Sequence, residues 1–388
     1  MAADAPTPTD LACPDCGRTY DAGPDEPWRC DCGRPLELAD RPLPTGPAPE
    51  FEQLDARRGL WAFDAFVPIE PRVTLGEGFT PLQDAPEWGP NAQFKLEYVF
   101  PSGSFKDRGA TTTLSRAAEL GVERVVEDSS GNAGAAVAQY AARAGIEADI
   151  YVPADAKASK LAAIERVGAT PIEIEGSRQD VTDACIERVA RSRAGADPRQ
   201  RGDAWYASHA WNPAFFAGTA TVAFEIAAQR DWDVPDAVVA PLGHGTLFLG
   251  AYRGFRALTD AGWTDEMPRL LGAQAAGYAP IADELHGDGP GGASGTPPDD
   301  NEVADGIQIR EPVRKDQILD AIEATDGDAI ALGADPVEDA LDRLHRGGFY
   351  VEPTCAAAPA ALERYRERGV VDPGDDVVVA LTGSGLKS

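Results

Sequence analysis

The 388-residue sequence contains little lysine, because only six of its 35 basic residues are lysine and the rest are arginine. No apolar run reaches the about 18 residues that suggest a membrane-spanning helix, and the first ten residues lack the hydrophobic core of a signal peptide. We therefore expect no membrane partner. Six cysteines are too few for a disulfide scaffold, and four of them cluster, which indicates a reducing cytoplasm.

Positive charge is also scarce, since 64 acidic residues oppose 35 basic ones and the net charge is −29. A field of this sign repels phosphate backbones and anionic lipids, so we expect no nucleic-acid partner. Abundant acid with little lysine is typical of salt-loving organisms, in which salt screens the self-repulsion. The alternative is an acidic protein from an organism that does not live at high salt. The apolar fraction of 43% is enough for a sizeable core.

The chain divides into a tail, a small module and a longer region. Residues 1–10 are polar and predict a flexible tail, and residues 11–45 form a short cysteine-rich module with a proline-rich exit. From about residue 60, strand-like runs alternate with helical stretches, which predicts α/β lobes with parallel sheets. Residues 286–302, rich in glycine and proline, predict a mobile surface loop.

The predicted elements can be placed from their periodicity and their end signals. Strands are expected at residues 93–99, 124–128, 148–152, 170–174, 237–240, 269–274 and 377–381. Helices are expected at residues 105–120, 132–144, 159–167, 181–191, 217–229 and 246–258.

The cysteine-rich module contains two pairs, Cys13 with Cys16 and Cys30 with Cys32, and each pair is followed by Gly-Arg. Two such turns can direct four thiolates at one centre, which suits a structural Zn²⁺ ion. The module is too short for a core of its own, so the metal would supply its folding energy. A redox pair or packed thiols are the alternatives. Cys185 and Cys355 lie in apolar segments and are expected to be packing residues.

Lys106 lies at the start of the predicted helix 105–120, where Ser104 and Asp107 have the spacing of a capping box. A cation is unfavourable at a helix N-terminus, and the helix dipole and burial both lower the pKa of such an amine. A neutral amine is what Schiff-base formation needs, so Lys106 is a candidate nucleophile rather than a surface lysine.

Two strand-to-helix turns are candidate anion sites, because free N–H groups and the positive helix end face the bound group. The first contains Ser130, Gly131, Asn132 and Ala133, with Ser130 or Asn132 as the expected cap. The second runs through Gly243, His244, Gly245, Thr246 and Leu247 and suits a phosphate. Phe248 replaces the last glycine of a dinucleotide fingerprint, which disfavours NAD.

Taken together, these segments resemble the threonine synthase family, within the tryptophan synthase β-like (fold-type II) pyridoxal-phosphate enzymes. The resemblance covers about residues 11–388 and is carried by GEGFTPL from Gly76, PSGSFKDRG around Lys106, SSGNAG around Asn132, PLGHGT around His244, EPTCAAA from Glu352 and LTGSGLK around Thr382. Many archaeal members also have an N-terminal zinc ribbon.

The resemblance implies a fold of two parallel or mixed-sheet α/β lobes preceded by the ribbon. Residues 46–100 and 216–388 would form the large domain that binds pyridoxal phosphate (PLP), and residues 101–215 the small domain. Lys106 would hold PLP covalently and act as the proton shuttle. The other cofactor contacts would be Phe105, Asn132, Gly243, His244, Gly245, Thr246, Leu247 and Thr382, and the substrate contacts Ser130, Gly131, Ala133 and Asn212. A homodimer in the cytoplasm is also implied.

The implied reaction converts O-phosphohomoserine and water to threonine and phosphate. The sequence departs from the family pattern at Ala133, Ala217, Thr219, Ala220 and His244, where substrate selection is expected. A related Ser/Thr ammonia-lyase or a β-replacing enzyme therefore stays open, as does a different class, a non-catalytic zinc-ribbon interaction protein on the same scaffold. A serine hydrolase is disfavoured because no Gly-x-Ser-x-Gly elbow is present.

Overall fold

The computed structural model describes residues 7–194, 204–287 and 300–387, so most of the predicted 1–10 tail and of the predicted 286–302 loop lies outside the described residues. Contacts between residues divide the chain into two compact units. The first contains the chain up to Pro44, together with Leu60–Glu77 and Lys106–Gly218. The second contains Thr45–Gly59, Gly78–Phe105 and Thr219–Ser388.

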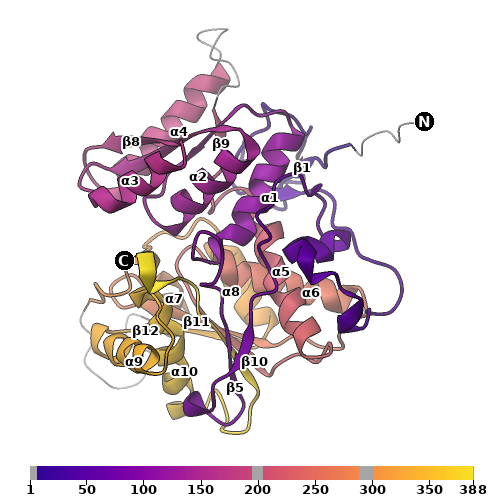
Figure 1. Ribbon diagram of the computed structural model, residues 1–388, viewed down its shortest axis with the longest axis vertical. Helices are drawn as coiled ribbons and strands as arrows, with labels where there is room; N and C mark the ends of the chain where they lie inside the picture. The colour runs from indigo at the N-terminus through magenta and orange to yellow at the C-terminus, as the bar shows by residue number, and fades with distance from the viewer. Residues whose placement is uncertain (1–6, 195–203, 288–299, 388) are drawn as a thin grey trace. The chain divides into compact units, whose positions relative to one another are not determined.

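The secondary structure alternates over most of the described chain (Figure 1). The α-helices are α1 (Lys106–Glu119), α2 (Asn132–Ala144), α3 (Ala158–Arg166), α4 (Arg178–Ala194), α5 (Pro213–Gln229), α6 (Thr246–Asp260), α7 (Pro280–His286), α8 (Lys315–Ala324), α9 (Ala334–Arg346) and α10 (Ala357–Glu367). The strands are β1 (Leu11–Ala12), β2 (Thr19–Tyr20), β3 (Glu37–Leu38), β4 (Leu82–Asp84), β5 (Ala92–Lys95), β6 (Arg124–Glu127), β7 (Glu147–Pro153), β8 (Thr170–Ile174), β9 (Trp205–Tyr206), β10 (Ala237–Pro241), β11 (Arg269–Ala275), β12 (Asp328–Leu332) and β13 (Val377–Ala380).

The first unit is built on a parallel sheet of order β8-β7-β6-β9. Because successive strand residues face opposite sides, the sheet has two apolar faces. Val125 and Ile150 join the core formed with α1 and α2, whereas Val126 and Tyr151 join the core formed with α4. Both faces are covered by helices, as parallel sheets require.

The cysteine-rich module forms a small antiparallel sheet, β2-β1-β3, within the first unit. Its apolar residues share a core with Leu60, Trp61 and Ile69. A buried ion pair adds to this packing, since the Arg116 guanidinium of α1 donates to both carboxylate oxygens of Glu26 at 2.9 and 2.6 Å. The module is therefore held by apolar packing against the Leu60–Ile69 segment and by an ion pair to helix α1.

The second unit contains a mixed sheet of order β12-β11-β10-β13-β5-β4, in which the β4–β5 pair is antiparallel and the other pairs are parallel. Helices α9 and α10 cover one face, with Leu344 and Leu362 in the same core as Val239 and Val379. The predicted α/β architecture is confirmed.

The predicted helices and strands each overlap an observed element, and helix 132–144 and strand 170–174 agree at both ends. The sequence reasoning placed no element at α7, α8, α9, α10 or β12, which the structure contains. It also missed β4, whose polar residues give no strand pattern, and the 3₁₀ segment Ala56–Phe66.

Strand β5 and helix α5 are joined in the second unit by a buried charge pair. The side chains of Lys95 and Glu225 have no solvent exposure, and the ammonium lies 2.8 Å from the carboxylate. Lys95 also donates to the Thr80 carbonyl oxygen at 2.7 Å and to Gln229 Oε1 at 2.8 Å. Lys95 is thus one of the few lysines with an evident structural reason to be present.

We predict that Lys95→Met strongly destabilises the fold, because it leaves the Glu225 carboxylate buried without its cation. Removing one partner of such a pair costs about 3–5 kcal/mol. The matched control is Lys315→Met, since the Lys315–Glu284 pair is solvent-exposed and such pairs contribute about 0–1 kcal/mol. Urea unfolding of both variants measures the difference, and equal losses would contradict the prediction.

Candidate functional site

The four cysteine thiols of the N-terminal module converge on one point. Their Sγ atoms all lie within 4.8 Å of one another. Sγ of Cys13 is 3.6 Å from that of Cys32, and Sγ of Cys16 is 3.5 Å from that of Cys30. Tetrahedral zinc with Zn–S bonds of about 2.3 Å needs sulfurs about 3.8 Å apart. The donor set and its spacing therefore fit a closed zinc site.

The turns after the cysteines explain this convergence. Gly17 and Gly33 follow Cys16 and Cys32 at φ 73° and 87°, a left-handed conformation that favours glycine. The Cys32 backbone N–H and the Tyr20 hydroxyl hydrogen-bond to Cys30 and lower the pKa of its thiol to about 6. A thiolate is the form that binds metal, and these hydrogen bonds favour it at Cys30, whereas burial raises the pKa of Cys13.

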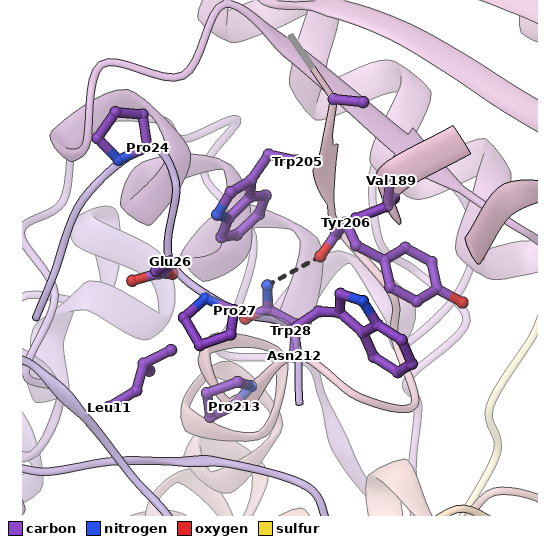
Figure 2. A pocket seen from close by; sticks show the side chains of 11 residues that line it. Leu11, Pro24, Glu26, Pro27, Trp28, Val189, Trp205, Tyr206, Asn212 and Pro213 are labelled. Carbon is purple, nitrogen blue, oxygen red and sulfur yellow. Dashed lines mark hydrogen bonds between the residues drawn. The ribbon is translucent and has the colours of Figure 1, made fainter. Parts of the chain in front are cut away.

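A small cavity lies where the module meets β9 and the start of α5 (Figure 2). Its volume is about 20 Å³, the room of one water molecule. Trp28 packs edge-on against Tyr206 and Trp211, with ring centroids 5.5 and 4.7 Å apart. This cavity is a packing feature and is too small for a substrate.

Lys106 is the first residue of α1, as predicted. Its Nζ atom lies 5.8 Å from the centroid of the Phe215 ring. Helix α1 approaches that ring closely because Gly109 has no Cβ, and a Cβ there would lie 1.9 Å from Phe215. The half-buried lysine therefore has an aromatic ring beside it at the start of the helix.

The predicted capping box is wrong. Ser104 is fully buried, and its Oγ has no hydrogen-bond partner among the described residues. Asp107 instead accepts a hydrogen bond from the Tyr140 hydroxyl at 3.3 Å, and the same hydroxyl lies 3.0 Å from Glu77 Oε2. Burial and the two carboxylates raise the pKa of Tyr140 far above its ordinary value, so this side chain stays a donor. Glu77 of the GEG segment thus helps to hold the start of α1.

The turn between β6 and α2 has a backbone cap. The first helical residue is Asn132 and the N-cap is Gly131, so the prediction that Ser130 or Asn132 would cap the helix is wrong. The Gly131 N–H donates to Ser129 Oγ at 3.2 Å. Gly134 is needed for close packing, because a Cβ there would lie 1.8 Å from the Ser129 carbonyl oxygen.

The segment after β9 begins at the same edge of the sheet as this turn, since β6 and β9 are parallel neighbours. Asn212 from this segment caps α5, because its Oδ1 accepts the Ala214 N–H at 3.0 Å. Its amide nitrogen donates to the Tyr206 carbonyl oxygen at 3.2 Å, the dashed line in Figure 2. Both the nitrogen and the oxygen of the Asn212 amide therefore make structural hydrogen bonds.

The sequence reasoning missed a buried acid at the end of β6. The Glu127 carboxyl lies 2.7 Å from Nδ1 of His209, and both residues are buried. Burial raises the pKa of Glu127 well above its ordinary value and Asp128 adds to this rise, whereas the charge of Lys106 lowers it. A glutamate directly after the two buried valines Val125 and Val126 was the available signal.

The turn from β10 to α6, in the second unit, runs from the end of a strand into the start of a helix, as predicted. Gly245 is the N-cap with φ 77°, and Thr246 is the first helical residue. A Cβ on Gly243 would lie 3.2 Å from Ile307, and one on Gly245 would lie 2.5 Å from Ile318. Backbone N–H groups at this helix start face the turn, which suits an anion.

Thr382 lies at the same sheet edge as that cradle, because β13 and β10 are parallel neighbours. The Phe105 N–H donates to the Thr382 carbonyl oxygen at 3.0 Å, and Ser104 pairs with Gly383. The Thr382 N–H lies 2.9 Å from the Cys355 sulfur. This ladder holds the residue before Lys106 against the C-terminal segment. Cys355 and Cys185 are buried in the cores, as predicted.

Each unit, taken by itself, contains residue types that suit PLP. The first unit has an amine at a helix start and the Ser130–Ala133 turn. The second unit has a glycine turn at a helix start and the Thr382 hydroxyl. Within the described residues, no helix is long and apolar enough to cross a bilayer.

Comparisons with known proteins agree with this reading. A family model described as pyridoxal-phosphate dependent enzyme matches residues 73–383. Threonine synthase of Methanocaldococcus jannaschii is 33% identical over 97% of this chain and 92% of that protein. Threonine synthase of Methanosarcina acetivorans is 34% identical over 84% of this chain and 80% of that protein.

A solved structure shares the fold. Maize serine racemase matches with a TM-score of 0.63 and 23% identity, over 86% of this chain and 93% of that chain. The expected fold-type II arrangement is thereby supported, and the expectation of a PLP-dependent lyase of the threonine synthase type is confirmed. The chain belongs to the threonine synthase family of the pyridoxal-phosphate dependent enzymes.

Proposed function

We propose that this protein converts O-phosphohomoserine and water to threonine and phosphate. The observation that carries the proposal is Lys106 as the first residue of α1, in a chain about one third identical to threonine synthases over nearly its whole length. When bound, PLP would withdraw electrons from the bonds of the substrate's α-carbon.

The residues of this chain would bind the cofactor and the substrate and would move the proton. Lys106 would hold the cofactor and then move a proton between the α- and β-carbons, since a positioned base typically contributes about 10²–10⁴ in rate. Phe105 would wall the ring, and Asn132 would hydrogen-bond the ring hydroxyl. The Ser130–Ala133 backbone would bind the substrate carboxylate, with Asn212 nearby.

The remaining cofactor contacts would come from the second unit. Gly243, His244, Gly245, Thr246 and Leu247 would hold the phosphate of PLP. Thr382 would offer the ring nitrogen a neutral hydroxyl, which leaves the ring a weaker electron sink and suits elimination over transamination. A small amino acid as substrate and a homodimer complete the proposal.

A Ser/Thr ammonia-lyase is the second candidate. The observation that favours it is Ala133, which is 2% exposed at the turn proposed to bind substrate, where the family pattern has a hydroxyl-bearing threonine. An apolar side chain there removes one hydrogen-bond donor that a phosphorylated substrate could use.

The proposed covalent link between Lys106 and the cofactor can be tested by spectroscopy. Lys106→Ala should abolish the visible absorption band of the lysine-bound cofactor, because no other amine would take its place. Lys157→Ala is the control, since Lys157 is exposed and should leave the band unchanged. A band that persists in Lys106→Ala would refute the proposed role.

Product analysis separates the two candidate reactions. The holoenzyme is offered O-phosphohomoserine, serine and threonine in separate reactions. We expect threonine and free phosphate from the first and no ammonia from the others. Ammonia with a keto acid from serine or threonine, and no phosphate release, would replace the proposal with the ammonia-lyase.

We further propose that the four cysteines bind one structural Zn²⁺ ion. Elemental analysis should find one zinc per chain, and Cys13→Ser should lose it and lower the melting temperature. Cys185→Ser, a buried thiol outside the cluster, is the control for destabilisation without loss of metal. A zinc content that is unchanged in Cys13→Ser would contradict the assignment.

A further inference from the structure

Glu127 is a buried acid whose hydrogen bonding is incomplete. Its side chain is fully buried at the end of β6, and Oε1 lies 2.7 Å from Nδ1 of His209. The second oxygen, Oε2, has no hydrogen-bond partner among the described residues. A buried oxygen without a hydrogen bond lowers the stability of the folded state. Glu127 therefore needs a reason for its presence other than a contribution to stability.

The acid and the lysine share one aromatic neighbour. The Phe215 ring lies 5.8 Å from Nζ of Lys106, and its centroid lies 6.2 Å from that of the His209 ring. The positive charge of Lys106 acts on Glu127 and opposes the effect of burial on the pKa of that carboxyl. The amine and the Glu127–His209 pair are therefore gathered around Phe215.

The other titratable groups around Glu127 are either hydrogen-bonded to neighbours or uncharged. Asp128 accepts hydrogen bonds from the hydroxyls of Tyr206 at 2.7 Å and Thr182 at 2.6 Å. Burial raises the pKa of Cys185 and of Tyr206, so both stay neutral. Asp128 repels a negative Glu127, whereas Lys106 attracts it.

We propose that Glu127, oriented by His209, is the proton partner of the Lys106 amine and thus a positioning residue for the proposed reaction. The inference rests on the proposed role of Lys106. One proton moves between them: the ammonium and the carboxylate become a neutral amine and a carboxylic acid. Total charge is unchanged, so the transfer leaves no isolated charge at the buried carboxyl.

This pairing gives Lys106 what its role requires. The amine must be neutral to attack the cofactor aldehyde or take a substrate proton, and it must be charged to return that proton. A nearby acid can give a proton to the amine and take it back. The His209 hydrogen bond fixes Oε1 and leaves Oε2 as the atom available to the amine.

The scarcity of lysine makes a direct test practical. Apoprotein labelled with ¹³C at lysine Cε should give six signals, and Lys106→Arg assigns the one of interest. We expect Glu127→Gln to lower the pKa of the Lys106 amine by at least about one unit, because a neighbouring opposite charge shifts a pKa by about 1–3 units. An unchanged Lys106 titration would overturn the proposal.

Glu119→Gln is the matched control. Glu119 also has a buried oxygen without a hydrogen-bond partner, but it ends the same helix, about 20 Å from Lys106 at about 1.5 Å per residue. Its replacement should leave the Lys106 titration unchanged. An equal shift in both variants would show a general charge effect and would also overturn the pairing.

Two further readouts separate positioning from a structural role. The melting temperature of Glu127→Gln should equal or exceed that of the unaltered protein, since a buried acidic oxygen is replaced by a neutral amide of similar size. Its kcat should fall with a shifted pH profile and little change in KM, and Glu127→Asp should restore part of the loss. A large fall in melting temperature with an unshifted profile would contradict the proposal.

Discussion

The structure of the first unit depends on the burial of a polar helix. Most residues of α1 are buried, although its sequence, KDRGATTTLSRAAE, is rich in hydroxyls and charges. Burial is tolerated because most of these groups have partners: the Thr111 hydroxyl donates to the Val73 carbonyl oxygen at 2.6 Å, and that of Thr112 to Ala214 at 2.7 Å. Such bonds fix the helix along its length and so fix Lys106 at its start.

The two ends of α1 are held by different acids from distant parts of the chain. Glu77 reaches the first turn through the Tyr140 hydroxyl, and Glu26 of the cysteine-rich module pairs with Arg116 in the last turns. Burial raises the pKa of Glu26, whereas Arg116 lowers it. The module thereby contacts the helix that carries Lys106, so the proposed zinc ion would be linked to that helix through the Glu26–Arg116 pair.

Periodicity and motifs predicted the elements that have regular patterns, and they could not predict polar burial. Residues 124–128 were recognisable as a strand because apolar residues precede a glycine turn, and the observed strand is Arg124–Glu127. Nothing local in the sequence shows that Glu127 meets His209, since 82 positions separate them and only the parallel β6–β9 pairing brings them together. The Ser104 capping box failed for a related reason, because the chain there pairs with the C-terminal segment instead. The domain limits and the roles of the site residues stay predictions.

The surface carboxylates that give the chain its negative charge are in contact with water, whereas the Glu127 carboxyl is buried. Surface carboxylates interact through water, where about 0.15 M salt already screens beyond about 8 Å. Glu127 is fully buried, so salt screens its interaction with Lys106 less than it screens the surface charges. A protein with a net charge of −29 can therefore have a stability that depends strongly on salt and a proton partner at its lysine that depends on salt much less. The buried location of the acid, rather than the overall charge, sets the chemistry available to Lys106.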